Sequence, residues 1–282
     1  MGAIEKALFG FIDKAVEKAK KRTLPSHLED DGLLYCDICG APIQCRQEIL
    51  GKEMILPCIC KCEKAENDRK KEEERQAEIA NNIIRLRAAC FDSAEMRKWR
   101  FDADDGKQEE TSKISKNFVK NFDKLKADGR GLLFFGDVGT GKTFQAACIA
   151  NGLIDLNLSV RMTTIARIVN DLQGSLSGRN EYFDKLCRYE LLILDDLDAE
   201  RNTEFVNEVI FEVVDGRHQS GKPLIVTTNL TRKEMLMAQD KNKKRIYSRI
   251  LERCYPVNVI GIDRRKASLA SDFAEMKKLL EG

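Results

Sequence analysis

The sequence lacks long apolar segments, a strong net charge and a secretion signal. No run of about 18 apolar residues occurs, so we expect no membrane-spanning helix and no membrane partner. Residues 1–8 carry charged side chains where a signal peptide has its apolar core, and Lys6 stands where a myristoylation signal needs Ser or Thr. The formal net charge is only +2, so composition alone calls for no polyanionic partner. We therefore expect a cytosolic protein.

The cysteine content excludes one common architecture and suggests another. Ten cysteines in a chain without a secretion signal argue against a disulfide framework. Six of the ten lie between Cys36 and Cys62, which points to a metal site. The length of 282 residues suggests two domains, and an apolar share of 43% is enough to fill a core.

Cys36 and Cys39, followed by Gly40, have the spacing of a zinc knuckle, in which a tight turn presents two thiolates to one ion. A β-hairpin would bring a second pair of thiolates to them from farther along the chain. Cysteines fill all four ligand positions, and no His or carboxylate ligand leaves an open coordination position, which favours a structural ion. Free thiols and an iron–sulfur cluster are the competing interpretations. We predict a Zn²⁺ site formed by Cys36, Cys39, Cys60 and Cys62, with Cys58 and Cys45 as alternative ligands.

Two segments around these cysteines have helical patterns. Residues 3–21 carry a narrow apolar stripe, typical of a helix that covers the metal module or docks on a partner protein. Residues 62–87 are rich in Glu, Lys, Arg, Gln and Ala, as in a solvated helix that links two domains. We therefore divide the chain into an N-terminal domain over residues 1–90 and a second domain over residues 91–282.

The segment 136–143 fits the pattern G-x-x-x-x-G-K-[ST], and its context fits as well. An apolar run at 131–135 predicts a buried strand before it, and the residues up to 153 predict a helix after it. Lys142 would reach the β- and γ-phosphates of a nucleotide, and the Thr143 hydroxyl would bind Mg²⁺. The predicted nucleotide-binding residues are Gly136, Asp137, Val138, Gly139, Thr140, Gly141, Lys142, Thr143 and Phe144.

Strands and helices alternate after this motif. Further strands are predicted at 160–164, 191–194 and 223–229, with helices at 113–126, around 168–172 and at 203–217. This alternation predicts an α/β fold with a parallel sheet and a ligand site at the carboxyl ends of the strands. The predicted fold class is a P-loop NTPase, a parallel sheet flanked by helices, with a small N-terminal zinc-binding helical domain.

Three polar residues end the predicted strands. Asp195 and Asp196 follow an apolar strand, where Mg²⁺ would compensate the cost of burying carboxylates. We assign Asp195 to the metal and Asp196 as the base that orients or polarises the attacking water. Asn229 ends the next strand, and its amide would hold that water or sense the γ-phosphate. A helix N-cap at the two acids and an Asx-turn at Asn229 are the structural alternatives.

Together these motifs resemble an AAA+ ATPase, and more narrowly the helicase-loader branch of DnaC, DnaI and IstB-like proteins. The resemblance is carried by the segments at 136–143, 191–197, 222–230, 245–253 and 263–265. It implies that Asn229 is sensor 1, that Arg249 is an arginine finger acting on a neighbouring subunit, and that Arg264 or Arg265 is sensor 2. Most AAA+ enzymes have Glu where this chain has Asp196, so we expect slow turnover.

The resemblance implies an ATP-dependent loader of a DnaB-type replicative helicase onto single-stranded DNA in a bacterial cytosol, encoded by a host or a phage. It also implies ATP, Mg²⁺ and Zn²⁺ as bound groups, self-association through the ATP sites, and single-stranded DNA contacts within 163–188. Residues 241–266 carry nine basic and two acidic side chains, some of which would serve nucleotide. The alternatives are an IstB-type transposition ATPase on duplex DNA and a nucleotide-binding adaptor with little turnover. A P-loop kinase is disfavoured because no acceptor-site or lid signature is present.

Overall fold

The computed structural model describes residues 10, 24–174, 178–197, 203–263, 273 and 276–281. Apart from Gly10, the helix predicted for residues 3–21 thus falls outside the described residues, as do the two sensor-2 candidates, Arg264 and Arg265. The chain divides into two compact units, Met1–Ile79 and Ala80–Gly282. Within the described residues, no helix has the length and apolar character needed to cross a bilayer.

The described part of the first unit contains two antiparallel strand pairs. Strands β1 (Ser26–Leu28) and β2 (Leu34–Cys36) form one pair, and β3 (Gln44–Ile49) and β4 (Lys52–Pro57) form the other. Leu50 and Gly51 connect β3 to β4 with φ angles of 54° and 74°, as a two-residue hairpin turn of type I′ requires. This hairpin lies in the sequence between the two cysteine pairs, where the ligand spacing predicted one.

Helix α2 (Lys61–Cys90) has the solvated character that its sequence predicts. Ion pairs one turn apart, such as Arg69 with Glu66 and Glu73, stabilise its exposed first half. Its last turns belong to the second unit, where Cys90 is fully buried. There Arg161 donates hydrogen bonds through Nη1 to the carbonyls of Ala89 (2.9 Å) and Cys90 (3.2 Å). A cation on the final carbonyls of a helix stabilises its C-terminus.

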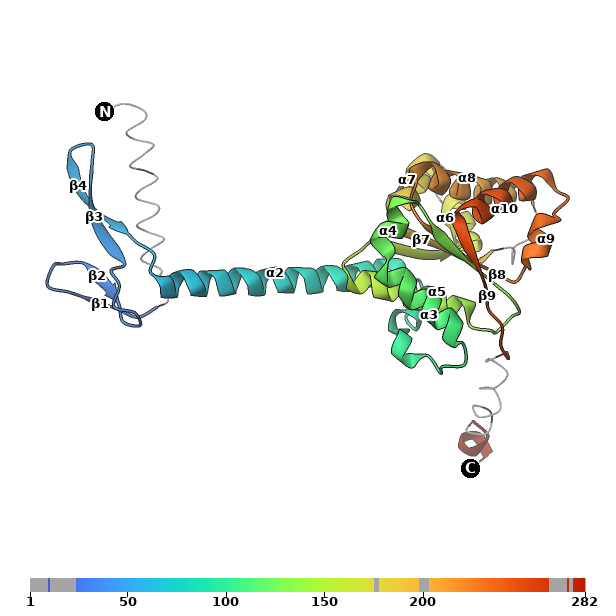
Figure 1. The fold of residues 1–282 in the computed structure, drawn as a ribbon, viewed down its shortest axis with the longest axis horizontal. Coiled ribbons are helices and arrows are strands. Elements are labelled where there is room, and N and C mark those ends of the chain that lie inside the picture. Colours follow the sequence, from blue (N-terminus) through green and yellow to red (C-terminus); the bar gives the residue numbers. More distant parts are fainter. Residues whose placement is uncertain are drawn as a thin grey trace. The chain divides into compact units, whose positions relative to one another are not determined.

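A five-stranded parallel sheet forms the centre of the second unit, with helices around it (Figure 1). Its strand order is β6-β7-β8-β5-β9. The strands are β5 (Gly131–Phe135), β6 (Val160–Thr164), β7 (Leu191–Leu197), β8 (Leu224–Thr228) and β9 (Cys254–Asn258). Because β8 lies between β5 and β7, the carboxyl ends of these three strands are neighbours. The parallel α/β fold predicted from the sequence is therefore confirmed.

Helices cover both faces of the sheet, which explains why its central strands contain continuous apolar runs, at Leu132–Phe135, Leu191–Leu194 and Leu224–Val226. On β5, Leu132 and Phe134 pack towards one set of helices, and Leu133 packs towards the other. The first face is covered by α3 (Glu109–Lys120), α4 (Phe122–Ala127) and α5 (Lys142–Asp155). The second is covered by α6 (Ile165–Gln173), α7 (Arg179–Arg188), α8 (Glu204–Ser220) and α10 (Lys241–Arg253), with the short α9 (Arg232–Leu236) beside α10.

The structure corrects one predicted helix, at 113–126, and gives the exact start of another, at 203–217. The single helix predicted at 113–126 is two helices, α3 and α4, because the chain leaves helical geometry at Asn121. Helix α8 begins after Thr203, whose side chain accepts a hydrogen bond from the N–H of Val206 and so caps the helix. The short 3₁₀ turns Met96–Lys98 and Phe101–Ala103 connect α2 to α3.

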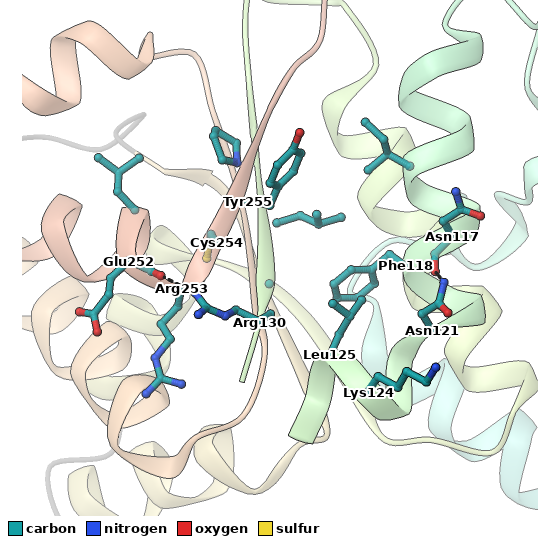
Figure 2. A pocket seen from close by; sticks show the side chains of 15 residues that line it. Asn117, Phe118, Asn121, Lys124, Leu125, Arg130, Glu252, Arg253, Cys254 and Tyr255 are labelled. Carbon is teal, nitrogen blue, oxygen red and sulfur yellow. Dashed lines mark hydrogen bonds between the residues drawn. The ribbon is translucent and has the colours of Figure 1, made fainter. Parts of the chain in front are cut away.

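A groove of about 770 Å³ opens at the amino-terminal ends of β5 and β9 (Figure 2). Phe118 and Leu125 line it from α3 and α4, and Tyr255 lines it from β9. Strand β5 runs away from this groove, starting at Gly131 and ending at Phe135, where residues 136–143 follow. The groove and the phosphate-binding motif therefore lie at opposite ends of β5.

Candidate nucleotide and metal sites

The loop after β5 has the backbone conformation that the glycines of the motif predict. Gly139 and Gly141 have φ angles of 77° and 99°, in the left-handed region that favours glycine. A Cβ atom at Gly139 would lie 1.9 Å from Oδ1 of Asp263, so a larger side chain would force Asp263 to shift. The N-terminus of α5 follows directly at Lys142, and such a terminus attracts phosphate.

Lys142 is buried inside this loop. Its Nζ donates hydrogen bonds to the carbonyls of Gly136 (2.8 Å) and Asp137 (2.7 Å), and the Thr140 hydroxyl also donates to Asp137 (2.8 Å). The amide of Gln108, at the start of α3, donates to the carbonyl of Thr140. These hydrogen bonds hold the loop in its conformation. They also keep the Lys142 ammonium group inside the loop, next to the start of α5.

Val138 lies within the loop, and Phe144 directly follows it. Val138 is exposed, with 54% of its surface accessible. Phe144, on the first turn of α5, packs on the indole of Trp99 at 5.7 Å between ring centroids. The sequence pattern gave no sign of Trp99, because it lies on the connection between α2 and α3.

Asp195 and Thr143 meet at the carboxyl end of the sheet. The Thr143 hydroxyl donates to Asp195 Oδ1 at 3.0 Å, and the Thr227 hydroxyl donates to the same oxygen at 2.6 Å. Burial raises the pKa of the Asp195 carboxyl above its ordinary value of 3.8, while the two hydroxyls act in the opposite direction. A buried carboxylate beside a hydroxyl is an oxygen donor set that suits Mg²⁺, so Thr143 and Asp195 fit the predicted magnesium site.

Asp196 has a left-handed backbone, with φ of 58°, at the point where the register between β7 and β8 shifts. This conformation is unfavourable for a residue with a Cβ atom, and such conformations cluster at functional sites. It leaves the Asp196 carboxylate exposed, next to Asn229, whose Nδ2 donates to Asp196 Oδ1 at 3.3 Å. The structure therefore brings together the two residues to which the sequence assigned the attacking water.

Thr227 is a site residue that the sequence reasoning missed. Its buried hydroxyl donates to Asp195 and accepts the N–H of Asp196 at 2.8 Å, so it joins the two acids. The available signal was its position after the apolar residues Leu224–Val226 of β8. Because Val226 pairs with Leu194, Thr227 neighbours Asp195 on β7. A threonine at that position of an apolar strand is a reason to look for a polar partner.

Arg249 lies on α10, and its described contacts are with α8. Its guanidinium forms an ion pair with Asp215 and lies over the ring of Phe211, with Cζ 5.3 Å from the centroid. Within the part of the chain that the structure describes, the Arg249 guanidinium forms no ion pair or hydrogen bond with residues 136–143. This placement agrees with a residue that acts outside its own nucleotide site, as the resemblance implied, and the role itself stays a prediction.

The four predicted zinc ligands are brought together in the first unit. The sulfur atoms of Cys36, Cys39, Cys60 and Cys62 all lie within 4.8 Å of one another. Four thiolates around one Zn²⁺ are separated by about 3.8 Å, so this group fits the ion closely. The alternatives Cys45 and Cys58 are not part of the group.

The surroundings of these thiols suit a metal site. Backbone N–H groups of Ile38 and Cys39 lower the pKa of the Cys36 thiol to about 7. The N–H of Glu63 donates to the Cys60 sulfur at 3.4 Å, although burial raises the pKa of that thiol. Cys39 raises the pKa of Cys62 to about 11. A bound cation would offset the repulsion between neighbouring thiolates, and the N–H donors would stabilise the thiolates further.

Comparisons with known proteins agree with this geometry. Residues 48–270 match the family described as IstB-like ATP binding protein. The chain is similar to the replicative helicase loader DnaI of Bacillus subtilis, with 30% identity over 161 residues, or 53% of this chain and 51% of that protein. It is also similar to the replicative helicase loader DnaC of Escherichia coli, with 30% identity over 125 residues, or 43% and 50% of the two chains.

Two solved structures share the fold. One of DnaI aligns with a TM-score of 0.54 at 24% identity, covering 64% of this chain and 99% of that one. One of the DnaC helicase loader aligns with a TM-score of 0.52 at 22% identity, covering 60% and 100%. The chain spans about half the length of the curated relatives that it matches.

Proposed function

Because the chain belongs to the family of IstB-like ATP binding proteins, we propose that it is an ATPase that loads a replicative helicase onto single-stranded DNA. The observation that carries this proposal is the meeting of the phosphate loop, the Thr143–Asp195 pair and the Asp196–Asn229 pair at one edge of the sheet. The relatives named replicative helicase loaders support the choice of substrate and partner.

Nucleotide binding follows from the loop. Backbone N–H groups of residues 136–141 and the N-terminus of α5 receive the phosphates, and Lys142 exchanges its two carbonyl partners for phosphate oxygens. Thr143 and Asp195 would hold Mg²⁺, which would neutralise negative charge on the phosphates. The hydrogen bond from Thr227 keeps the Asp195 carboxylate oriented towards Thr143.

Hydrolysis then depends on Asp196 and Asn229. Asp196 accepts a proton from, or orients, the attacking water, and the Asn229 amide fixes the position of the Asp196 carboxylate. Arg249 of a second copy supplies a guanidinium that offsets charge on the γ-phosphate, so turnover requires assembly. Arg264 or Arg265 acts on the nucleotide of its own chain.

The first unit is the helicase-binding part in this proposal. Cys36, Cys39, Cys60 and Cys62 would hold Zn²⁺, which would tie together the segments that carry them. This module, with the segment before it, contacts a DnaB-type helicase. Single-stranded DNA is bound by the ATPase unit within residues 163–188. The complex acts in the bacterial cytosol.

The test is ATP turnover by the full chain, measured alone, with single-stranded DNA and with the cognate replicative helicase. We expect slow basal turnover that rises with either partner. Lys142→Ala should abolish nucleotide binding, whereas Asp196→Asn and Arg249→Ala should retain binding and lose turnover by about a hundredfold or more. Loading is read as ATP-dependent transfer of the helicase onto DNA coated with single-strand-binding protein. Turnover that ignores both partners, together with a silent Arg249→Ala, would reject the loader assignment.

The family description favours a second candidate, a transposition ATPase of the IstB type that assembles on duplex DNA. A duplex arm in the same assay separates the two. Stimulation by duplex but not by single strands, with no response to the helicase, would select this candidate. Nucleotide binding without turnover under any condition would instead select a nucleotide-binding adaptor.

A further inference from the structure

Helices α8 and α10 pack against each other, and Asp215 on α8 faces Arg249 on α10. The two side chains form an ion pair through Nη1 of the arginine, and both are largely covered, with 19% and 29% of their side-chain surface exposed. The second carboxylate oxygen of Asp215 accepts a hydrogen bond from Gln219, one turn later on α8, at 2.7 Å. The carboxylate is therefore held from both sides.

Phe211 restricts the same guanidinium from another direction. It precedes Asp215 by one turn of α8, and the Cζ atom of Arg249 lies 5.3 Å from its ring centroid. Arg245, one turn earlier on α10, lies over the same ring at 4.5 Å. Cation–π contact and the ion pair together confine a side chain that would otherwise sample many rotamers.

The other side of Arg249 is open. It lines a hollow of about 530 Å³ along α10, together with Lys241, Lys244, Arg245 and Ser248. A guanidinium has five N–H donors, and a phosphate binds best to two of them side by side. Since Asp215 engages Nη1, the edge formed by Nε and Nη2 remains for a ligand that enters from this basic hollow.

We propose that Asp215 is a positioning residue for Arg249, holding its guanidinium so that the free edge faces the triphosphate bound to a second copy of this chain. The proposal rests on the arginine-finger role given under the proposed function and adds the residue that makes the finger rigid. A preorganised finger loses little conformational freedom when the second copy docks, so more of the contact energy is available in the transition state.

The test compares Asp215→Asn with Asp215→Glu in the full chain, at protein concentrations that saturate turnover. We expect Asp215→Asn to lower kcat about tenfold, with KM for ATP changed less than about twofold, because misplacing a transition-state contact affects kcat. Asp215→Glu should recover most of the loss. Glu212→Gln is the matched control, because it removes another α8 ion pair, with Arg179 at 2.8 Å, and should leave kcat unchanged.

A double-mutant cycle separates positioning from general support of the fold. If Asp215 acts through Arg249, Asp215→Asn should cause no further loss in an Arg249→Ala background. The same tenfold loss in that background would overturn the proposal. So would an unchanged kcat in Asp215→Asn, and in that case an inactive Arg249→Ala would leave the proposed function standing. A silent Arg249→Ala, by contrast, would reject the finger itself.

A milder variant covers the case in which Asp215→Asn melts below the assay temperature. Gln219 is exposed, so Gln219→Ala removes only the hydrogen bond that fixes the Asp215 carboxylate. A lower kcat at an unchanged melting temperature would support positioning. An unchanged kcat would overturn it.

Discussion

The Thr227 hydroxyl donates a hydrogen bond to Asp195 Oδ1 at 2.6 Å, from the strand next to the one that carries the acid. The same hydroxyl accepts the backbone N–H of Asp196 at 2.8 Å. One buried side chain thus fixes both the carboxylate assigned to Mg²⁺ and the strained backbone of the carboxylate assigned to water. Neither acid can shift without breaking a hydrogen bond to β8.

Thr227→Val should damage stability and turnover together. Valine keeps the shape but removes the buried hydrogen bond to Asp195 and leaves the partly buried Asp196 N–H without its acceptor, at a cost of about 1–3 kcal/mol. We expect a lower melting temperature and a kcat reduced at least about tenfold, measured by thermal unfolding and ATP turnover. Thr227→Ser keeps the hydroxyl and should restore both. Equal behaviour of the valine and serine variants would contradict the bridging role.

Asp195→Asn should stabilise the nucleotide-free protein. Burial raises the folded-state pKa of Asp195 above its ordinary value of 3.8, so the folded state holds this proton more tightly than the unfolded chain does. The resulting contribution to stability is fully present below pH 3.8 and is lost as the pH rises through the raised pKa. Asparagine stays neutral, so its advantage over the wild type should grow across that interval and then level off.

The measurement is the melting temperature of both proteins between pH 4 and pH 8, with EDTA and without nucleotide. Adding ATP and Mg²⁺ should reverse the order, because only the wild type retains the carboxylate that compensates the cation. A difference between the two proteins that does not vary with pH would show that ionisation of Asp195 is not its cause.

Local signals predicted the phosphate loop and its two flanks well. Strand β5 occupies the predicted residues 131–135, because an apolar run before a glycine-rich turn has few other structures available. Strand β9 was missed, since Cys254–Asn258 contains Pro256 and has no apolar alternation of its own. It forms by pairing with β5, which precedes it by more than a hundred residues. Such pairing depends on tertiary packing, and a local pattern does not reveal it.

The residues of the candidate site also fall into two groups, those that local sequence patterns predicted and those that depend on tertiary contacts. The spacing of residues 136–143 and the acids at 195 and 196 predicted a nucleotide and Mg²⁺ site. Such residues rarely follow buried strands for any other structural purpose. The partners of these residues were hidden. Thr227 reaches Asp195 across the sheet, and Asp215 reaches Arg249 from another helix. Contacts between elements distant in sequence set these pairs, so they became visible only in three dimensions.

Gly139→Ala should abolish ATP binding, and Gly106→Ala should not. The two glycines have nearly the same left-handed backbone, with φ of 77° and 72°, so each substitution carries a similar conformational cost of about 1 kcal/mol. Only Gly139 faces a collision, because its Cβ would lie 1.9 Å from Asp263, whereas nothing lies within 4 Å of a Cβ at Gly106. Titration with a fluorescent ATP analogue distinguishes them. Equal loss of binding in both variants would assign the effect to backbone strain alone.

The purified protein should contain about one Zn²⁺ per chain, and the ion should hold the first unit together. Among the described residues of that unit, the buried apolar cluster consists of Cys36, Ile43 and Cys60, so two of these three are thiols. Because these thiols would be metal ligands, metal binding contributes folding energy to this part of the unit. Chelation should expose the hairpins to protease while the melting temperature of the ATPase unit stays the same.

The choice of ligands is tested by single substitutions and by pH. Cys36→Ser and Cys62→Ser should lose zinc in a metal assay, whereas Cys45→Ser and Cys58→Ser should retain it. In the metal-free chain the pKa of Cys36 is about 7 and that of Cys62 about 11, so zinc must displace thiol protons to bind. We therefore expect zinc affinity, measured by competition with a chelator, to be at least about tenfold higher at pH 8 than at pH 6. Zinc loss in Cys58→Ser with retention in Cys62→Ser would instead assign the fourth ligand to Cys58.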